Sequence, residues 1–284
     1  MSIISYKLII LKFVIFKIKE VYLNMSAETV LITGATKGIG LEFAKIFAGH
    51  RYNLVLVARD ELLLEKQAVF LKKEYGVEVN TFVGDLSNHE TVESLYTYLK
   101  REGTPIDILI NNAGAGGLGL MTELDIKKEI ECLQLNMISL TYLTRLIADE
   151  MIKRNNGKIL NVASTAAFQP TPRMSMYGAS KSYVLSFTEA IAEELKDTGV
   201  QVSVLCPPST KTPLTEGLAS TGTKIFIKNL MDPKAVAKCG YDGLMKNKTV
   251  IIPGFKNKLM AKSVGILPRK WVTTYTRKMI EEKV

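Results

Sequence analysis

Short runs of β-branched and aliphatic residues alternate with longer amphipathic stretches along most of the chain. From residue 28 onward this pattern predicts seven strands, at Thr29–Thr33, Asn53–Ala58, Glu78–Val83, Ile106–Asn111, Gly157–Val162, Gln201–Cys206 and Thr249–Ile252. The amphipathic stretches predict helices near residues 39–48, 60–75, 88–102, 122–153, 175–197 and 233–246. Strands that alternate with helices indicate a parallel sheet with helices on both faces. We therefore expect one doubly wound α/β domain over residues 25–284.

The two ends of the chain differ from its body in charge. Of the net charge of +9, residues 1–24 contribute four Lys and one Glu, and residues 224–284 contribute 14 basic and 4 acidic side chains. The body, residues 25–223, has 19 basic and 23 acidic side chains and is mildly acidic. The basic tails, including a C-terminal extension over about 255–284, suit an anionic partner such as a membrane surface, an acyl carrier or a phosphorylated substrate. A solvated lysine-rich surface is the simpler interpretation.

Residues 1–24 are treated as an N-terminal extension. The apolar run from Leu8 to Phe16 is interrupted by Lys12 and is shorter than the roughly 18 residues that a membrane span needs. No small-residue cleavage site follows it, which weakens a signal-peptide interpretation. A disordered extension or a misplaced translation start fits better, because Met25 directly precedes the first predicted strand. An amphipathic segment on a membrane surface is the alternative.

Cysteine and histidine usage narrows the chemistry. Cys132, Cys206 and Cys239 are scattered and form no CxxC pair, which suits a reducing cytosol rather than a disulfide framework or a zinc site. His50 and His89 have no metal-ligand partner at helical spacing. No nucleic-acid recognition motif accompanies the basic tail. We expect a cytoplasmic protein without a metal site that does not bind nucleic acid.

A glycine-rich loop follows the first predicted strand and leads directly into a helix. Its sequence, Thr33 to Gly40, reads TGATKGIG. Such a turn lets the backbone approach a pyrophosphate and directs helix N–H groups at its charge. The spacing G-x3-G-x-G differs from GxGxxG, so we interpret the loop as a variant of the same device, with a plain tight turn as the alternative. The residues expected to contact a dinucleotide are Gly34, Thr36, Lys37, Gly38, Ile39 and Gly40.

The end of the second predicted strand bears on which dinucleotide would bind. An NAD site typically has an acidic residue about 20 residues past the loop, to hold the ribose 2′-hydroxyl. This chain instead has Arg59 there and Lys37 within the loop, and two cations suit the 2′-phosphate of NADP(H). Asp60 would repel that phosphate, so we expect it to face solvent. Asp85 is a candidate acceptor for the adenine amino group, and capping of the following helix is its alternative role.

Tyr177 and Lys181 stand at i, i+4 and share one face of a predicted helix. The spacing alone is a weak signal, because Tyr96 and Lys100 repeat it. Ser164, however, lies just past a predicted buried strand, and ligands of parallel sheets bind at the carboxyl ends of strands. A nearby ammonium lowers the pKa of a phenol from about 10. Tyr177 could then pass a proton to a carbonyl oxygen held by Ser164 while hydride arrives from a cofactor.

In this combination the chain resembles the short-chain dehydrogenase/reductase family, in its NADP-preferring subgroup, over residues 28–255. The family's TGxxxGxG loop appears as Thr33–Gly40 and its NNAG segment as Asn111–Gly114. The resemblance implies a Rossmann-like fold with a mostly seven-stranded parallel sheet. It also implies that Asn136 keeps a water in a proton relay to the catalytic Lys. The implied catalytic set is Asn136, Ser164, Tyr177 and Lys181, and the implied further cofactor contacts are Asn112, Ala113, Gly114, Tyr177, Lys181 and Thr212.

Two regions bear on cofactor contacts and substrate. The chain has Pro207-Pro208 where the family usually has Pro-Gly, and the second proline removes a backbone donor. A substrate loop is expected over about 209–230, with mixed polar and apolar residues. The segment Phe255–Leu267 and a following amphipathic helix resemble a branch associated with 3-oxoacyl or hydrophobic ketone reduction. Ordinary packing is the simpler role for the apolar residues of that helix, Val272, Tyr275 and Met279.

We therefore expect reversible, NADPH-dependent reduction of a hydrophobic or 3-oxoacyl ketone or aldehyde, with Tyr177 as general acid and base. The alternative is a catalytically silent NADP-binding sensor or scaffold of the same fold. Retention of Ser164, Tyr177 and Lys181 together argues against that alternative. The resemblance also implies a homodimer or homotetramer that assembles through the helices near residues 122–153 and 175–197.

Overall fold

A parallel sheet forms the centre of the molecule in the computed structural model, which describes residues 27–284. The seven strands lie in the order β3-β2-β1-β4-β5-β6-β7, and every neighbouring pair is parallel. This arrangement confirms the doubly wound sheet that the sequence predicts. The expected extension at residues 1–24 lies outside the described residues. The strands are β1 (Thr29–Thr33), β2 (Asn53–Ala58), β3 (Val79–Val83), β4 (Ile108–Asn111), β5 (Gly157–Val162), β6 (Val200–Leu205) and β7 (Val250–Ile251).

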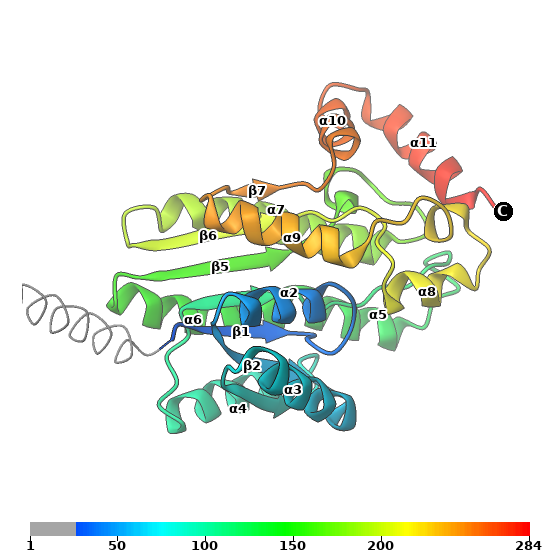
Figure 1. The fold of residues 1–284 in the computed structure, drawn as a ribbon. Coiled ribbons are helices and arrows are strands. Elements are labelled where there is room, and N and C mark those ends of the chain that lie inside the picture. The colour runs from blue at the N-terminus through cyan, green and yellow to red at the C-terminus, as the bar shows by residue number, and fades with distance from the viewer. Residues whose placement is uncertain (1–26) are drawn as a thin grey trace, which may run out of the picture.

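Helices cover both faces of the sheet (Figure 1). One face carries α2 (Gly38–Gly49), α3 (Glu61–Tyr75) and α9 (Pro233–Met245), and the other carries α4 (His89–Arg101), α6 (Leu140–Lys153) and α7 (Ser175–Glu194). The α5 helix (Ile126–Leu133) packs against α7. Beyond β7, α10 (Phe255–Val264) and α11 (Arg269–Glu281) project from the body (Figure 1). No helix within residues 27–284 is long and apolar enough to cross a membrane.

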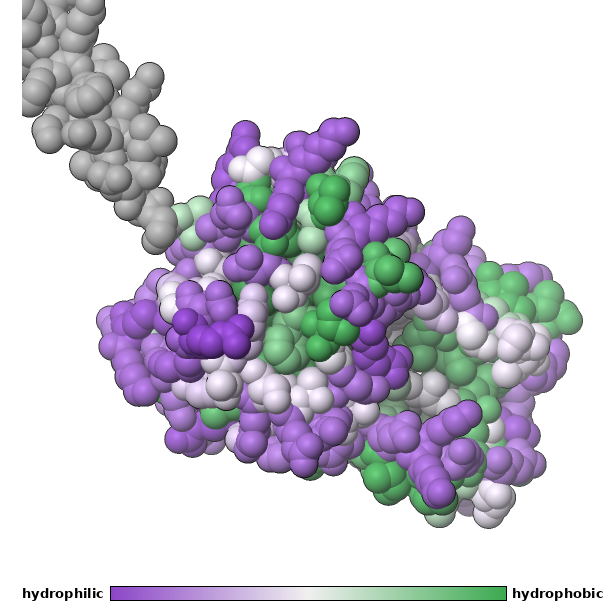
Figure 2. Space-filling model, turned by 90° about the horizontal axis from the view of Figure 1, so that it is seen from below, coloured by the Kyte–Doolittle hydropathy of each residue, from purple (hydrophilic) through white to green (hydrophobic). Residues whose placement is uncertain are grey.

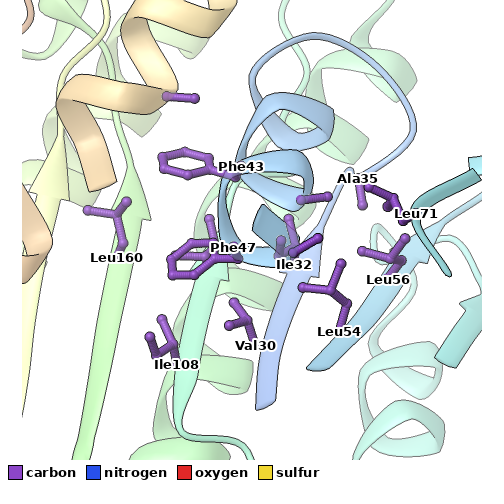
Figure 3. Packing of buried hydrophobic residues seen from close by; sticks show 14 of the residues in the cluster. Val30, Ile32, Ala35, Phe43, Phe47, Leu54, Leu56, Leu71, Ile108 and Leu160 are labelled. Carbon is purple, nitrogen blue, oxygen red and sulfur yellow. The ribbon is translucent and has the colours of Figure 1, made fainter. Parts of the chain in front are cut away.

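The sheet is buried on both faces because its strands are apolar at nearly every position. In β1, Val30 and Ile32 face α2, whereas Leu31 between them faces the layer of α4 and α6. Phe43 and Phe47 stand one helical turn apart on α2 and pack onto the first of these faces (Figure 3). This packing fixes α2 against β1, and with it the loop that joins them.

The position of β1 at the middle of the sheet determines where a ligand can bind. β1 pairs with β2 on one side and with β4 on the other. The chain leaves β1 towards β2 and leaves β4 towards β5, so the loops that follow these two strands diverge. In open parallel sheets such a reversal of strand order opens a crevice at the carboxyl ends of the strands.

The structure differs from the predicted elements in three places. The single helix predicted over 122–153 is interrupted by a π-helical segment, η1 (Gln134–Ser139), between α5 and α6. The expected substrate loop contains a short helix, α8 (Pro213–Ala219), and a 3-10 turn, η3 (Lys224–Phe226), which were not predicted. The segment Phe255–Leu267 contains α10, which was also not predicted as a helix, whereas the amphipathic helix expected after it is present as α11.

Candidate active site

A cavity of about 1230 Å³ opens at the carboxyl ends of the strands. It runs from the glycine loop past the ends of β2, β4, β5 and β6 to α8, α10 and α11. Viewed from the side of α3 and α4, the surface is mainly hydrophilic, and it is hollowed towards this end of the molecule (Figure 2). The cavity therefore lies where the strand order predicts a ligand.

The glycine loop has the geometry of an anion-binding turn. Gly34 and Gly38 have φ of 65° and 56°, in the left-handed region that favours glycine. Lys37 caps α2 without a side-chain hydrogen bond, so the first N–H groups of the helix remain available to a phosphate. Five of the six residues predicted to contact a dinucleotide line the cavity: Gly34, Thr36, Lys37, Gly38 and Ile39.

Gly40 is the exception among the predicted loop contacts. It does not border the cavity but packs behind the loop, where an added Cβ would collide with the carbonyl oxygen of Gly34 and stand 2.5 Å from Asn112 Nδ2. The direct contact with a cofactor therefore stays a prediction for Gly40. Its role is to let α2 approach the preceding strand closely.

The Asn-Asn-Ala-Gly segment ties the end of β4 to the glycine loop. Asn112 Nδ2 donates to the carbonyl oxygens of Thr33 and Gly34, at 2.9 and 3.2 Å. The backbone N–H groups of Asn112 and Ala113 both donate to the Thr33 hydroxyl, at 3.0 Å. Asn111 Nδ2 reaches across to Asn161 Oδ1 on β5, at 2.9 Å. These bonds hold the loop rigidly beside the cavity, which Asn112, Ala113 and Gly114 also line.

Arg59 and Asp85 form an ion pair at the cavity rim, with 3.2 Å between Arg59 Nη1 and Asp85 Oδ2. Burial acts to raise the pKa of Asp85, but hydrogen bonds from Ser87 and Arg59 outweigh it and lower that pKa. The alternative role of Asp85 as a helix cap is taken by Asn88, which caps α4. Asp60 is exposed and caps α3, but it also borders the cavity, so its expected orientation away from a bound phosphate stays a prediction.

Ser164, Tyr177 and Lys181 come together at the centre of the cavity wall. Ser164 caps the 3-10 turn η2 (Thr165–Phe168) directly after β5, where its hydroxyl accepts from Ala166 N at 3.1 Å, and it acts to lower the pKa of the Tyr177 phenol. Lys181 lies one turn after Tyr177 on α7, with its Nζ 5.8 Å from the centroid of the Tyr177 ring. The three side chains that the sequence singled out therefore share one site.

The competing pair, Tyr96 and Lys100, has a different environment. Both side chains lie on α4 and bind Glu150, with distances of 3.1 Å from the Tyr96 hydroxyl and from Lys100 Nζ. Neither borders the cavity. The same Tyr-x3-Lys spacing thus gives a hydrogen-bonded cluster on the surface in α4, whereas in α7 it places both side chains in the cavity wall.

Burial sets the protonation of the central pair. It raises the pKa of Tyr177, and the hydrogen bond from Ser164 only partly opposes this. Burial also lowers the pKa of Lys181 to about 8. The lowering of the phenol's pKa that we expect from Lys181 and a bound cofactor therefore stays a prediction. The Lys181 ammonium donates to the carbonyl oxygen of Val162, at 2.9 Å, and desolvation of the phenol dominates.

Asn136 lies within the π-helical segment and is fully buried rather than exposed to the cavity. Its Nδ2 donates to Ala115 O and Ser180 Oγ, at 2.9 and 3.0 Å, and its Oδ1 accepts from Ala115 N at 3.0 Å. A Cβ on Gly114 would stand 3.2 Å from both Asn136 Oδ1 and Lys181 Nζ. Asn136 is thus next to Lys181 but its side chain is engaged, so its expected part in a water relay stays a prediction.

The double proline leaves this part of the cavity wall well hydrogen-bonded. The carbonyl oxygen of Pro207 accepts from Thr165 N at 2.9 Å, and that of Pro208 accepts from Thr210 Oγ1 at 2.7 Å. Thr212 caps α8 in a capping box with Thr215. The Cγ2 of Thr212 would lie 3.0 Å from a Cβ on Gly38, so Thr212 lies beside the glycine loop. Its expected contact with the cofactor stays a prediction.

Two further residues of the cavity, Glu129 and Cys132 on α5, were missed by sequence reasoning. Both are buried. They precede Asn136 by seven and four residues, which places all three on one face of the helix. This spacing is a sequence signal that could have identified Glu129 as a site residue, because a Glu on the same helix face as two buried residues is unusual.

Comparisons with known proteins agree with this geometry. The family described as short chain dehydrogenase matches residues 28–222. A putative ketoacyl reductase of Streptomyces coelicolor is 34% identical over 193 residues, which are 67% of this chain and 74% of that protein. The 17-beta-hydroxysteroid dehydrogenase type 3 of Mus musculus is 34% identical over 210 residues, 72% of this chain and 67% of its own.

Solved structures show the same fold. A short-chain dehydrogenase from Sphingobium yanoikuyae in complex with NADPH superposes with a TM-score of 0.75 at 31% identity and covers 84% of this chain and 94% of its own. A bulky-bulky ketone specific alcohol dehydrogenase from Comamonas testosteroni superposes with a TM-score of 0.72 at 30% identity. The match covers 84% of this chain and 93% of that protein. The chain therefore belongs to the short-chain dehydrogenase family and is an oxidoreductase that acts on CH–OH or C=O groups.

Proposed function

We propose that the protein uses NADPH to reduce, reversibly, the carbonyl group of an apolar or 3-oxoacyl ketone or aldehyde. One observation carries this proposal. A single cavity joins the glycine loop to Ser164, Tyr177 and Lys181 and then continues to an apolar wall. A dinucleotide and a carbonyl substrate would therefore meet at the one place where a proton donor is available.

The preference for NADPH rests on the cations at the rim of the cavity. Arg59 follows β2, its side chain is largely exposed, and Asp85 holds it at the cavity rim. Lys37 is exposed in the glycine loop. Asp60, which also borders the cavity, has one carboxylate oxygen engaged in capping α3, where it accepts from Leu63 N at 3.1 Å. The Sphingobium relative was solved with NADPH, as was an actinorhodin polyketide ketoreductase that is 28% identical.

The residues of the chain perform the proton transfer. Bound NADPH supplies the hydride. The raised pKa of Tyr177 keeps its phenol protonated at neutral pH, so the phenol serves as the acid that protonates the carbonyl oxygen. The Ser164 hydroxyl donates to the same oxygen and fixes its position. The Lys181 ammonium, 5.8 Å from the Tyr177 ring centroid, stabilises the negative charge left on the phenolate oxygen.

The far wall of the cavity favours an apolar substrate. Met174, Leu218 and Phe226 form a buried cluster against which Tyr177 packs. The α10 and α11 helices and the turn between them close the same end, with side chains that include Met260, Leu267 and Met279. Relatives of this chain are named as ketoacyl reductases, a hydroxysteroid dehydrogenase and very-long-chain 3-oxoacyl-CoA reductases, all of which suggest large apolar ketones.

The test is NADPH oxidation with 3-oxoacyl thioesters, bulky ketones, aldehydes and small sugars, for the unmodified protein and for Tyr177→Phe. We expect turnover of the apolar carbonyls and a loss of roughly 10³-fold in Tyr177→Phe, because the variant lacks the proton donor but keeps the ring. NADPH should still bind, because the other expected cofactor contacts remain. NADPH binding without turnover of any carbonyl would favour the silent sensor, and activity confined to small sugars would contradict the apolar substrate.

We also propose a homodimer or homotetramer that assembles through α6 and α7, to be measured by light scattering of the purified chain. A monomer at micromolar concentration would contradict this assembly.

A further inference from the structure

The carboxylate of Glu129 lies in the wall of the cavity without a partner. The residue is 6% exposed. Within residues 27–284 its side chain makes no ion pair and no hydrogen bond. Its oxygens are not fully buried, and because the residue lines the cavity, they are accessible from it. The other charged residues of α5, Lys127, Lys128 and Glu131, are exposed.

The groups around Glu129 do not satisfy its charge. Gly117 lies against the carboxylate, and the apolar side chain of Leu124 also lies beside Gly117. Cys132 lies one turn further along α5, and its thiol donates to the carbonyl oxygen of Ala115 at 3.0 Å. A carboxylate that is removed from bulk water is unfavourable unless a donor or a cation compensates it. Burial accordingly raises the pKa of Glu129.

The position of this carboxylate relative to the reacting centre is set by two consecutive glycines. Gly116 lies against the Tyr177 ring, since a Cβ added to Gly116 would stand 2.5 Å from Tyr177 Cδ2. Gly117 lies in the same way against Glu129 Oε1. Neighbouring Cα atoms are 3.8 Å apart, so the carboxylate is within roughly 12 Å of the phenol ring. The glycines place no side chain between them. One substrate molecule could therefore contact both groups.

We propose that Glu129 forms a second recognition site in the cavity and accepts a hydrogen bond from a hydroxyl or protonated amino group of the substrate. The substrate is then a ketone or aldehyde with a hydrogen-bond donor a few bonds away from its carbonyl group. A purely aliphatic ketone leaves the carboxylate unpaired, and a free carboxylate at that end is repelled. This inference rests on the proposed carbonyl reduction and names a further feature of its substrate.

The test compares cyclohexanone, 4-hydroxycyclohexanone and 4-aminocyclohexanone as substrates. The unmodified protein should prefer the two donor-bearing ketones by about tenfold or more in kcat/KM, because each pairs the buried carboxylate. Glu129→Leu should abolish both preferences. Glu129→Gln keeps a carbonyl acceptor and should retain the preference for the hydroxyl but lose that for the ammonium. Glu194→Gln, the same change at an exposed position of α7 outside the cavity, should alter neither.

Two measurements that need no turnover separate this inference from the proposed function. Dissociation constants of the three ketones for the NADP⁺-loaded protein should show the same order and the same response to Glu129→Leu. The Tm of Glu129→Leu should equal or exceed that of the unmodified protein, since an uncompensated buried charge is removed. Equal affinities for all three ketones, or a marked fall in Tm, would overturn the inference. Donor-dependent binding without reduction of any ketone would instead overturn the proposed reaction.

Discussion

The two ends of the cavity are built in different ways. At the cofactor end, the glycine loop is positioned by backbone geometry: two glycines with positive φ, a third packed against a carbonyl oxygen, and the amide of Asn112 bridging two strands. At the substrate end, α8, α10 and α11 contribute side chains from the surface of the molecule. The α10 helix buries none of its residues, and Phe255 at its start is 81% exposed.

This contrast shows that specificity for the cofactor and specificity for the substrate depend on different parts of the protein. A phosphate is recognised by main-chain N–H groups, which require a fixed backbone and hence glycine at fixed positions. A substrate is recognised by the size and polarity of side chains, which can change without altering the fold. The cofactor end should therefore respond strongly to the addition of one methyl group, and the substrate end should not.

The largest expected effect tests that difference directly with two matched changes. In Gly40→Ala the new Cβ would collide with the carbonyl oxygen of Gly34, so the loop must shift. We expect the dissociation constant for NADPH to rise about 100-fold and the Tm to fall. Gly217→Ala on α8 meets no atom within 4 Å. It should leave NADPH affinity unchanged and stabilise the protein by about 0.5–1 kcal/mol. Titration calorimetry and thermal melts measure both, and equal responses would contradict the comparison.

The same contrast explains how much could be read from the sequence. The strands were predicted because β-branched runs are long and uniformly apolar, and the glycine loop and the α7 pair were predicted because their spacing is rigid. The α10 helix was missed because it buries no residue, so no apolar face marks it. The π-helical segment was missed because residues 122–153 keep an overall helical periodicity. It widens the turn at Asn136 and presents its side chain to Ala115 and Ser180.

The protonation of the central pair shows what sequence reasoning could not supply. The spacing of Tyr177 and Lys181 implies contact, but not the degree to which each is desolvated. In the folded chain desolvation raises the pKa of one and lowers that of the other. Similarly, the spacing of Glu129 from Cys132 and Asn136 indicates a shared helix face, but the burial of Glu129 depends on the packing of α5 against α7.

A smaller effect is expected at Arg59, where the cofactor end depends on an exposed side chain. Arg59→Ala removes the guanidinium that we assign to the 2′-phosphate and also frees Asp85. The dissociation constant for NADPH should rise about tenfold, as for the loss of one charge-assisted hydrogen bond, while that for NADH should change little. Parallel titrations with the two cofactors measure this. An equal change for both would mean that Arg59 does not distinguish them.

The smallest effect, a pH dependence, separates activity from stability at Lys181. Burial lowers its pKa to about 8, so its ammonium is present below pH 8 and is lost above it. Ketone reduction should therefore be nearly constant up to about pH 8 and then fall towards tenfold per pH unit, because the phenolate loses its stabilising charge. Lys181→Met should give a low rate without this decline.

The contribution of Lys181 to stability has the opposite sign. The pKa is about 8 in the folded chain and 10.5 in the unfolded chain, so between these values the unfolded chain binds more protons. The contribution of this group to the free energy of unfolding should therefore rise with pH from about 8 to 10.5, over the range in which the rate declines. Denaturant melts at pH 7.5 and 9.5, compared with those of Lys181→Met, isolate that contribution. A rate that falls in parallel with stability in the unmodified protein would indicate unfolding rather than titration of the Lys181 ammonium.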